Sequence, residues 1–398
     1  MNLAYKNGDL KLGEHRLRDL CLQRSEPFYV YDLSHIQRRV RSFKAAFTLP
    51  KLRMFYAVKA NAHPQILRLI QQEGCGVDVV SGGEIRLALD NGFRGEDIIF
   101  SGVGKTEKEL VYALSNGIHQ INVESIPELE RVARLAAGLG IQAAVALRLN
   151  PHVNPQTHPY ITTGLRENKF GIDVAELPTL ERILESQASR LFLRGLTLHI
   201  GSQLLDVAPL QEAIEKILPL YESLQRKGFA MTSLDVGGGL GIDYLQGDEA
   251  VEHKLLADYG RVVSQLVTPL VEKTGAGVYF EPGRFLVAHA GVLLAQVQYV
   301  KRTPYKNFLI VNTGMHHLMR PSLYQAFHRI LPVTEAGDEF ELYDVVGPIC
   351  ESADVVGRDR RLPRMQEGDW IAIADTGAYG RVMASHYNAH ELPEEVAL

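Results

Sequence analysis

The sequence predicts an α/β protein in which a (β/α)8 barrel is joined to a smaller β-rich domain. Three observations predict it. Eight short apolar runs alternate with helical patterns over the first two-thirds of the chain, distinctive polar or small residues follow these runs, and the last third changes to β-rich segments. Alternating strands and helices are typical of parallel βα units, and eight such units is the number that closes a barrel.

The eight apolar runs are the strand candidates of the barrel. In chain order they are RMFYAVKA from Arg53, GVDVVS from Gly76, IIFSG from Ile98, QINVES from Gln120, AAVALRLN from Ala143, RGLTLHIGS from Arg194, SLDVGGGL from Ser233 and VYFEPG from Val278. Amphipathic segments with apolar residues at three- and four-residue spacing lie between them, namely Pro64–Glu73, Gly83–Asn91, Thr106–Ser115 and Ser125–Leu139. We therefore expect a barrel domain over residues 28–280.

The chain changes character from about Val292. The segments VLLAQVQYV, FLIVN, YDVVG and WIAIAD are rich in β-forming residues, with turn signals between them and little helical periodicity. This pattern predicts an antiparallel β-sandwich or a small Greek-key barrel. Because the residues before Phe28 precede the barrel, we expect residues 1–27 and 281–398 to form this second domain together.

Composition excludes several classes of partner. The formal net charge is −5 and charged residues make up 22%, so no nucleic-acid partner is expected. No apolar run approaches the ~20 residues that span a bilayer, and the start of the chain lacks a signal-peptide core. Three cysteines form neither a disulfide framework nor a paired metal-ligand spacing. A reducing cytoplasm is therefore the expected compartment.

Chemistry is expected where the strands end, because barrels of this kind build their active sites at the C-terminal ends of their strands. The residues at these ends are Lys59, Ser81, Ser101, Glu124, Asn150, His199, Gly237–Gly239 and Glu281. Lys59 follows the apolar run FYAV, where partial burial would lower its pKa and free the amine for a Schiff base. The alternative for Lys59 is a surface lysine whose stem packs on the strand.

Three further strand ends suggest cofactor binding. The run Gly237–Gly239 follows the seventh strand, where consecutive N–H groups can converge on a phosphate, although a tight turn is the alternative. Glu281 follows the eighth strand and could pair with a pyridinium nitrogen. His199 follows the sixth strand and could lie against a flat ring, or could be a satisfied polar residue in the barrel mouth.

The second domain offers a different set of candidates. Arg320 and Tyr324 lie in RPSLY, Cys350 and Glu351 in GPICESAD, and Tyr379 in DTGAYG. Arginine suits a carboxylate, glutamate suits an ammonium group, and a cysteine beside them could donate a proton. The doublet His316–His317 has no further ligand at metal spacing, so no metal site is expected.

These residues lie in motifs that resemble a known family. The motifs are FYAVKAN, VDVVSGGEI, IIFSGVGKT, HPYITTGLRENKFGI, HIGSQL, DVGGGLGIDY, EPGRFLVAHAG, RPSLY, GPICESAD and DTGAYG, and they run almost end to end. With them the chain resembles the fold-type III pyridoxal-phosphate decarboxylases, a family that includes ornithine-type and diaminopimelate-type members. The resemblance is strongest to the diaminopimelate type, and it implies a barrel plus a β-rich domain that contributes to the substrate site and the dimer interface.

The resemblance assigns roles to individual residues. It implies that pyridoxal 5′-phosphate is held as a Schiff base on Lys59, with His199 stacked on the ring, and that the cofactor-binding set is Lys59, His199, Ser202, Gly237, Gly238, Gly239, Glu281, Gly283, Arg284 and Tyr379. For the substrate it implies Arg284, Arg320, Tyr324, Glu351 and Tyr379. Cys350 would protonate the product carbon, and Cys350 with Glu351 would reach the neighbouring subunit's site, which implies a homodimer with shared active sites.

The implied reaction is decarboxylation of meso-2,6-diaminopimelate to L-lysine and CO2. The alternatives are a decarboxylase of a related carboxylated diamine or amino-acid conjugate, and a non-catalytic regulatory relative. Five positions depart from the family pattern and leave a related substrate open: Asn312, Thr313, His316, His317 and Arg381. The polar segment His158–Phe170 is long for a βα connection and is a candidate lid.

Overall fold

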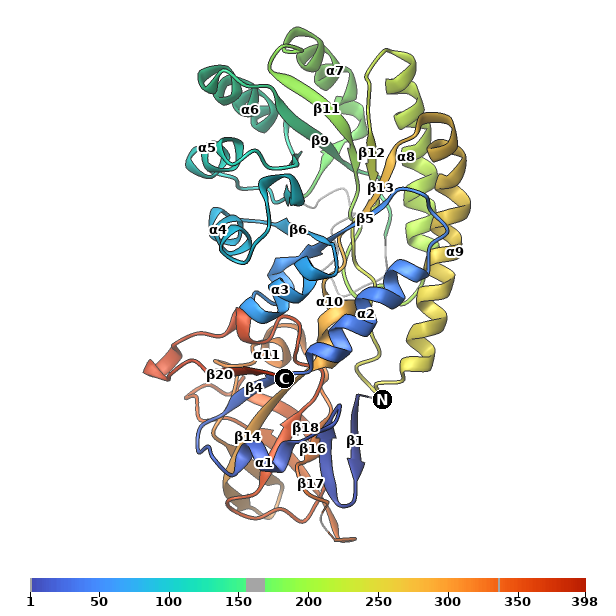
Figure 1. Cartoon of the computed structure of the whole chain (residues 1–398). Helices are drawn as coiled ribbons and strands as arrows, with labels where there is room; N and C mark the ends of the chain where they lie inside the picture. The colour runs from blue at the N-terminus through green and yellow to red at the C-terminus, as the bar shows by residue number, and fades with distance from the viewer. Residues whose placement is uncertain (1, 155–168, 336) are drawn as a thin grey trace. The chain divides into compact units, whose positions relative to one another are not determined.

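A computed structural model describes residues 2–154, 169–335 and 337–398 of the chain (Figure 1). The chain forms two compact units. The barrel unit comprises Val40–Gly241 and His253–Gly283, and the β-rich unit comprises the chain up to Arg39 together with Ile242–Glu252 and Arg284–Leu398. The chain therefore passes from one unit to the other several times.

The barrel unit contains a closed ring of eight parallel strands, which confirms the predicted barrel. The strands are β5 (Leu52–Ala57), β6 (Gly76–Val79), β7 (Ile98–Phe100), β8 (Gln120–Val123), β9 (Ala143–Asn150), β11 (Leu191–Thr197), β12 (Ser233–Asp235) and β13 (Gly277–Phe280). Each overlaps one of the eight predicted runs, although β5, β11 and β13 begin one to three residues before their runs. The ring closes because β13 pairs with β5 as well as with β12. A short strand, β10 (Ile172–Asp173), adds a parallel pair to β9.

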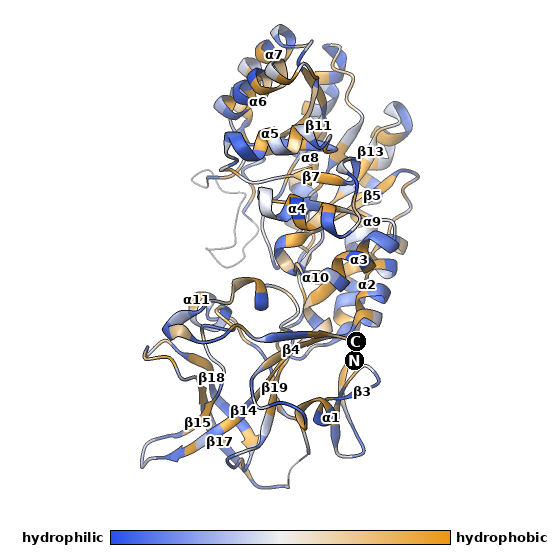
Figure 2. Ribbon diagram, turned by 60° about the vertical axis from the view of Figure 1, so that its left-hand side comes forward, coloured by the Kyte–Doolittle hydropathy of each residue, from blue (hydrophilic) through white to orange (hydrophobic). Residues whose placement is uncertain are grey.

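Helices follow the barrel strands in the expected alternation. They are α3 (Pro64–Gln72), α4 (Gly82–Asp90), α5 (Glu107–Ser115), α6 (Ile126–Leu139), α7 (Leu177–Ser186) and α8 (Ala208–Arg226). Figure 2 shows hydrophilic and hydrophobic residues side by side along α5, α6 and α7, as expected for helices with one buried face. Two further helices, α2 (Leu33–Ala45) and α9 (Glu249–Thr274), begin in the β-rich unit and continue into the barrel unit.

Three successive barrel helices begin with the same type of cap. The side chains of Ser81, Thr106 and Ser125 accept the backbone N–H groups three residues later, which satisfies donors that a helix N-terminus leaves unpaired. Ser81, a strand-end residue in the sequence analysis, therefore has a local structural role.

The β-rich unit is built on a mixed sheet with the order β16-β19-β14-β15-β17-β18. Its strands are β16 (Ile330–Pro332), β19 (Trp370–Ile373), β14 (Gly291–Arg302), β15 (Asn307–Val311), β17 (Phe340–Val346) and β18 (Val355–Pro363). Strand β4 (Phe28–Tyr31) joins this sheet through β14 and also pairs with β20 (Glu394–Ala397). A separate three-stranded sheet contains β1 (Leu3–Lys6), β2 (Asp9–Leu12) and β3 (His15–Arg16).

Two pairings in this sheet are parallel, whereas the sequence predicts an antiparallel arrangement. Strand β15 pairs in parallel with β17, and β4 pairs in parallel with β20. Parallel pairing needs a long connection, and the chain provides one between β15 and β17 that contains α11 (Arg320–Tyr324) and β16. The remaining short helices of the unit are α1 (Leu17–Cys21) and α10 (Arg284–Val287). No helix in the described part of the chain is long and apolar enough to cross a membrane.

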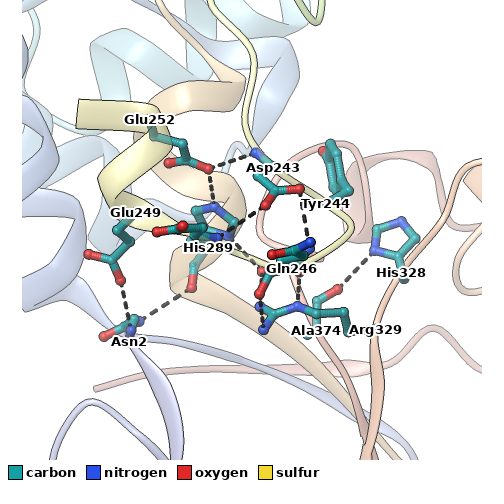
Figure 3. Close-up of polar contacts among 12 residues, drawn as sticks. Asn2, Asp243, Tyr244, Gln246, Glu249, Glu252, His289, His328, Arg329 and Ala374 are labelled. Atoms are coloured by element: carbon teal, nitrogen blue, oxygen red, sulfur yellow. Dashed lines mark hydrogen bonds and ion pairs between the residues drawn. The ribbon is translucent and has the colours of Figure 1, made fainter. Parts of the chain in front are cut away.

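A buried ionic network connects distant segments of the β-rich unit (Figure 3). At its centre His289 lies between two carboxylates, with Nε2 at 2.5 Å from Glu252 and Nδ1 at 2.6 Å from Asp375. Arg39 donates to Glu252 at 2.6 Å, and Arg329 donates to Asp375 at 3.1 and 3.2 Å. Burial alone would lower the pKa of His289, but the hydrogen bonds and charges of Asp375 and Glu252 outweigh it and raise the pKa to about 9. His289 is therefore a buried cation at neutral pH.

We predict that the stability of the protein falls as the pH rises through about 9, where His289 loses its proton. A histidine whose pKa is raised by folding stabilises the folded state. This contribution is fully present below the ordinary pKa of about 6.5 and is lost above the folded-state pKa. The free energy of unfolding should fall by an amount on the order of 3 kcal/mol between these limits. Thermal unfolding between about pH 6 and pH 10 measures this fall. His289→Gln should lower the unfolding temperature at neutral pH and flatten its decline in alkali. The matched control is His253→Gln, on an exposed position of α9, and parallel curves for wild type and His289→Gln would contradict the prediction.

Candidate active site

Lys59 lies just beyond the first barrel strand. Strand β5 ends at Ala57, and the chain then forms a 3-10 turn, Val58–Ala60, whose two flanking residues are buried while Lys59 is partly exposed. The Lys59 ammonium donates to Asp78 on the neighbouring strand β6, with Nζ at 3.1 Å from Oδ2. Asp78 is completely buried. The amine is therefore held at the C-terminal ends of the strands by a carboxylate that sequence reasoning missed, because Asp78 lies inside the apolar run GVDVV.

His199 follows strand β11 and lies beside the glycine run. The backbone N–H of Gly238 donates to His199 Nδ1 at 3.2 Å, which leaves the ring proton on Nε2. Burial, with the nearby charges of Arg148 and Lys59, holds the pKa of His199 well below its usual range. The imidazole is therefore neutral at neutral pH and offers a flat, uncharged face.

The glycine run is packed so tightly that only glycine fits. A Cβ on Gly237 would lie 2.2 Å from the carbonyl oxygen of Leu198, and one on Gly238 would lie 2.1 Å from the carbonyl oxygen of Glu281. Gly239 has a φ of +109° and would meet the carbonyl of Gly201 at 2.3 Å. These approaches are far shorter than a carbon–oxygen contact allows, so the run needs glycine for its close packing against the ends of β11 and β13.

Two of the three glycine N–H groups are used inside the barrel unit. Gly237 donates to Asp235 Oδ1 at 2.8 Å, and Gly238 donates to His199. The carbonyl of Gly237 accepts the N–H of Glu281, also at 2.8 Å. An anion bound by this run would therefore meet Gly239 and the residues that follow it, rather than all three glycines equally.

The turn after the eighth strand packs against the turn that carries Lys59. The N–H of Ala57 donates to the carbonyl of Pro282 at 3.1 Å. A Cβ on Gly283 would lie 3.1 Å from the Cβ atoms of both Ala57 and Ala60, so Gly283 allows the two turns to approach each other. Ser202 is half-buried in the segment after His199. The structure thus brings Lys59, His199, the glycine run, Glu281 and Gly283 to the same end of the barrel.

Glu281 lies at this end among other buried polar groups. Its Oε1 accepts the side-chain amide of Asn122 at 3.1 Å, and the same amide donates to Ser101 at 3.0 Å. Burial and the neighbouring carboxylates Asp235 and Asp78 raise the pKa of Glu281 well above its usual range, while Lys59 and Arg148 act in the opposite direction. A basic ring nitrogen placed here would meet a carboxyl group able to exchange a proton with it.

The two arginines predicted to bind the substrate both contact Tyr244. Arg284 donates from Nη1 to the Tyr244 hydroxyl at 2.8 Å, and its guanidinium lies over the Tyr379 ring, 4.8 Å from the centroid. The Arg320 guanidinium lies 4.6 Å from the centroid of the Tyr244 ring. Both arginines are buried, and such stacking on aromatic faces stabilises a cation without neutralising it. Tyr244 was missed because the sequence DYLQG reads as an ordinary turn.

Arg320 is positioned by a neutral histidine. His328 Nδ1 donates to the carbonyl of Ala374 at 2.8 Å, which leaves Nε2 to accept from Arg320 Nη1, also at 2.8 Å. Burial and the charge of Arg320 lower the pKa of His328 to about 3, so the histidine remains uncharged. Among the described residues no carboxylate forms an ion pair with Arg320. Its charge is therefore available to a bound anion.

The remaining predicted site residues lie on separate segments of the same unit. Cys350 and Glu351 are exposed between β17 and β18, and the hydroxyl of Tyr387 donates to Glu351 at 2.5 Å. Tyr324 is half-buried at the end of α11. Tyr379 has a φ of +56°, an unusual conformation for a non-glycine residue. Residues 158–168 of the predicted lid His158–Phe170 lie outside the described residues.

Four of the five residues that depart from the family pattern form hydrogen bonds within the β-rich unit, and the fifth, His316, contacts the ring of His317. Asn312 donates to the carbonyl of Ser25 at 2.9 Å. The His317 ring lies between the Thr313 hydroxyl, at 3.1 Å, and the carbonyl of Glu391, at 2.9 Å. The rings of His316 and His317 lie 3.6 Å apart, and Arg381 donates to the carbonyl of Pro393. Within the described part of the chain, no three His, Cys, Asp or Glu side chains are grouped to hold a metal ion.

Comparisons with known proteins agree with this geometry. Residues 33–288 match the family described as pyridoxal-dependent decarboxylase, pyridoxal binding domain. The diaminopimelate decarboxylase of Aquifex aeolicus is 42% identical over 394 residues, which cover 99% of this chain and 91% of that protein. The diaminopimelate decarboxylase of Vibrio cholerae is 41% identical over 392 residues, or 98% of this chain and 92% of that protein.

A solved structure extends the similarity to three dimensions. The crystal structure of diaminopimelate decarboxylase from Helicobacter pylori complexed with L-lysine matches with a TM-score of 0.89 and 40% identity, covering 96% of this chain and 94% of that one. The family match spans more than half of the chain, and the relatives cover nearly all of it. The chain therefore belongs to the pyridoxal-dependent decarboxylases and, among them, to the diaminopimelate decarboxylase family.

Proposed function

We propose that this protein decarboxylates meso-2,6-diaminopimelate to L-lysine and CO2 with pyridoxal 5′-phosphate as its cofactor. The observation that carries the substrate assignment is Arg320, a buried cation that stacks on Tyr244 and forms no ion pair with a described carboxylate. A carboxylate at the far end of the substrate would complete that site. Relatives over nearly the whole chain are diaminopimelate decarboxylases, which supports the same substrate.

The barrel unit fits pyridoxal phosphate. Lys59 provides the amine that attaches the cofactor covalently, and Asp78 holds it in place. Glu281 provides the carboxyl group for the ring nitrogen, and His199 provides a neutral flat surface. Gly239 follows two glycines whose N–H groups are already bonded, so we assign the phosphate contact of the run chiefly to it. When bound, pyridoxal phosphate withdraws the electron pair left on the α-carbon as CO2 departs.

The remaining cofactor contacts are proposals from the family resemblance. We assign Ser202, Gly283, Arg284 and Tyr379 to the phosphate side, together with Gly237–Gly239. Gly283 and Arg284 are consecutive residues, and Gly283 belongs to the barrel unit while Arg284 begins α10 of the β-rich unit.

On the substrate side, the proposed roles follow from charge. Arg320 and Tyr324 bind the distal carboxylate, with Arg284 contributing a second positive charge, and Glu351 binds the distal ammonium group. The Tyr387 hydroxyl that donates to Glu351 fixes the direction of that carboxylate. Binding the distal carboxylate and the distal ammonium group holds the substrate in one orientation. Only the α-carboxylate at the reacting end is then aligned to leave as CO2.

We also propose a homodimer in which Cys350 and Glu351 of one subunit complete the site of the other. Both residues are exposed on this chain, as proton donation to a partner's substrate requires. Exposed apolar side chains also lie on the sheet of the β-rich unit, namely Tyr299 on β14 and Phe340 and Leu342 on β17. Large exposed apolar groups on one sheet are typical of an interface. Free cysteines, including exposed Cys350, suit the cytoplasm.

We predict that the purified protein with pyridoxal phosphate releases CO2 from meso-diaminopimelate, and that ornithine and L-lysine are poor substrates. Neither of these amines carries a distal carboxylate, so each would leave Arg320 without its anion. Release of labelled CO2 from each α-carboxylate measures the difference. Faster turnover of another carboxylated amine than of diaminopimelate would sink this assignment and favour a related decarboxylase.

A second prediction concerns Arg320 directly. We expect Arg320→Ala to raise KM for diaminopimelate by an amount equivalent to roughly 2–5 kcal/mol, as for a broken buried charge pair, with little change in cofactor affinity. Arg320→Lys should recover part of the loss, because it restores the charge but not the bidentate geometry. Steady-state kinetics and cofactor titration separate the two effects. An equal loss of substrate and cofactor binding would assign Arg320 a structural role instead.

The shared-site dimer predicts complementation between inactive variants. Lys59→Ala should abolish covalent cofactor attachment, and Cys350→Ala should abolish most turnover, each in the pure state. Mixing the two should restore up to about one quarter of wild-type activity, because a heterodimer has one site with both defects and one site with neither. If Cys350 acts within its own subunit, the mixture will show no recovery, and this result would refute the proposal.

A further inference from the structure

A second carboxyl group lies beside the one assigned to the cofactor ring. Asp235 is the last residue of β12, and Glu281 directly follows the neighbouring strand β13. In the parallel register Asp235 is opposite Tyr279, and Glu281 lies two residues beyond that partner. Because side chains alternate along a strand, Asp235 and Glu281 project to the same side of the sheet. That side is the interior of the barrel, where Tyr279 packs against Phe55 and Ile99.

The hydrogen bonds of Asp235 account for only one of its two oxygens. Oδ1 accepts the N–H of Gly237 at 2.8 Å. Oδ2 is buried, and no N–H or O–H group in the described part of the chain donates to it. Asp235 and Glu281 end neighbouring strands on the same side of the sheet, so their carboxyl groups are diagonal neighbours. A proton held between two such buried carboxyl groups relieves the repulsion that two adjacent anions would have.

The surrounding charges do not neutralise the pair. Asp78 faces it from β6 as a third carboxylate, and Tyr259 faces it from α9. The nearby cations are Lys59, which is bonded to Asp78, and Arg148 on β9, which is bonded to Glu124 at 2.9 Å. Burial raises the pKa of both Asp235 and Glu281, and each is raised further by negative charge nearby.

We propose that Asp235 is a positioning residue that shares one proton with Glu281, and that its other oxygen fixes the N–H of Gly237 at the start of the glycine run. One carboxyl group would then connect the ring-binding carboxyl to the phosphate-binding backbone. The proposal rests on the proposed function only in taking Glu281 as the partner of the cofactor ring. The shared proton is a property of the protein itself and exists before the cofactor binds.

The consequence is a protein that carries its own proton for the ring nitrogen. Glu281 without Asp235 would be surrounded by fewer negative charges and would ionise at lower pH. The site would then have to take a proton from solvent when it binds a protonated ring. With Asp235 present, the proton is already held in the barrel. Binding of the cofactor ring then takes up no proton from solvent near neutral pH.

The first test measures the proton directly in the full-length chain freed of cofactor. Infrared spectra recorded in H2O and D2O at about pH 7.5 should show a protonated carboxyl band in the wild type. At this pH Glu84, whose pKa burial raises to about 6, is ionised. The band should disappear in Asp235→Asn and in Glu281→Gln. It should persist in the control Glu128→Gln, which removes a buried carboxylate that already faces Lys105 at 2.7 Å.

The second test measures proton uptake on binding of pyridoxine 5′-phosphate, which has the ring and phosphate but no aldehyde to react with Lys59. Calorimetry in buffers of different ionisation enthalpy gives the number of protons taken up. We expect almost none for the wild type and for Glu128→Gln, and up to about one for Asp235→Asn. The asparagine keeps an oxygen to accept from Gly237, so the phosphate-binding backbone is preserved and the binding constant should change little.

Two results would overturn the proposal. If the wild-type spectrum shows no protonated carboxyl band, there is no shared proton. This measurement does not depend on any variant folding. Equal proton uptake by wild type and Asp235→Asn assigns Asp235 a structural role in holding the glycine run. Neither result contradicts the proposed decarboxylation, which is tested separately by CO2 release from diaminopimelate.

Discussion

Closure of the barrel between β13 and β5 is the constraint on which the site depends. These strands are the last and the first of the ring, and their pairing places the turn that carries Lys59 against the turn that follows Glu281. The bond from Ala57 to Pro282 and the small Gly283 make that contact close. A lysine and a glutamate far apart in sequence thus reach the same end of the barrel through the pairing of their two strands and the contact between the turns.

Much of the fold and part of the site could be predicted from the sequence. Parallel strands are buried on both faces, so each appears as an apolar run, and all eight runs became strands. Lys59, His199 and Glu281 stood out because they end such runs. Asp78 and Asp235 did not, because a single carboxylate inside an apolar run gives no signal until strand register shows its neighbours. The parallel pairing of β15 with β17 was likewise missed, since local periodicity carries no information about a partner beyond a long connection.

Histidines in the β-rich unit show why residue type alone does not define a role. His289 is held as a cation by Glu252 and Asp375, whereas His328 is kept neutral by burial and by Arg320. The first connects separate segments by charge, and the second accepts a hydrogen bond from Arg320 without neutralising it. Their opposite protonation states come from the groups that surround each ring in the folded chain. Such roles follow from three-dimensional contacts and from no local motif.

The tight packing of the glycine run has an evolutionary consequence. Any side chain at Gly237, Gly238 or Gly239 would overlap a backbone carbonyl, and backbone atoms cannot move aside as a flexible side chain can. This part of the barrel is therefore closed to variation whatever amine the protein uses. Glu351 is exposed on this chain and Tyr324 is only half-buried, so substitutions there meet no such packing barrier. Descendants of this chain could acquire new substrates by altering those positions while they inherit the cofactor site unchanged.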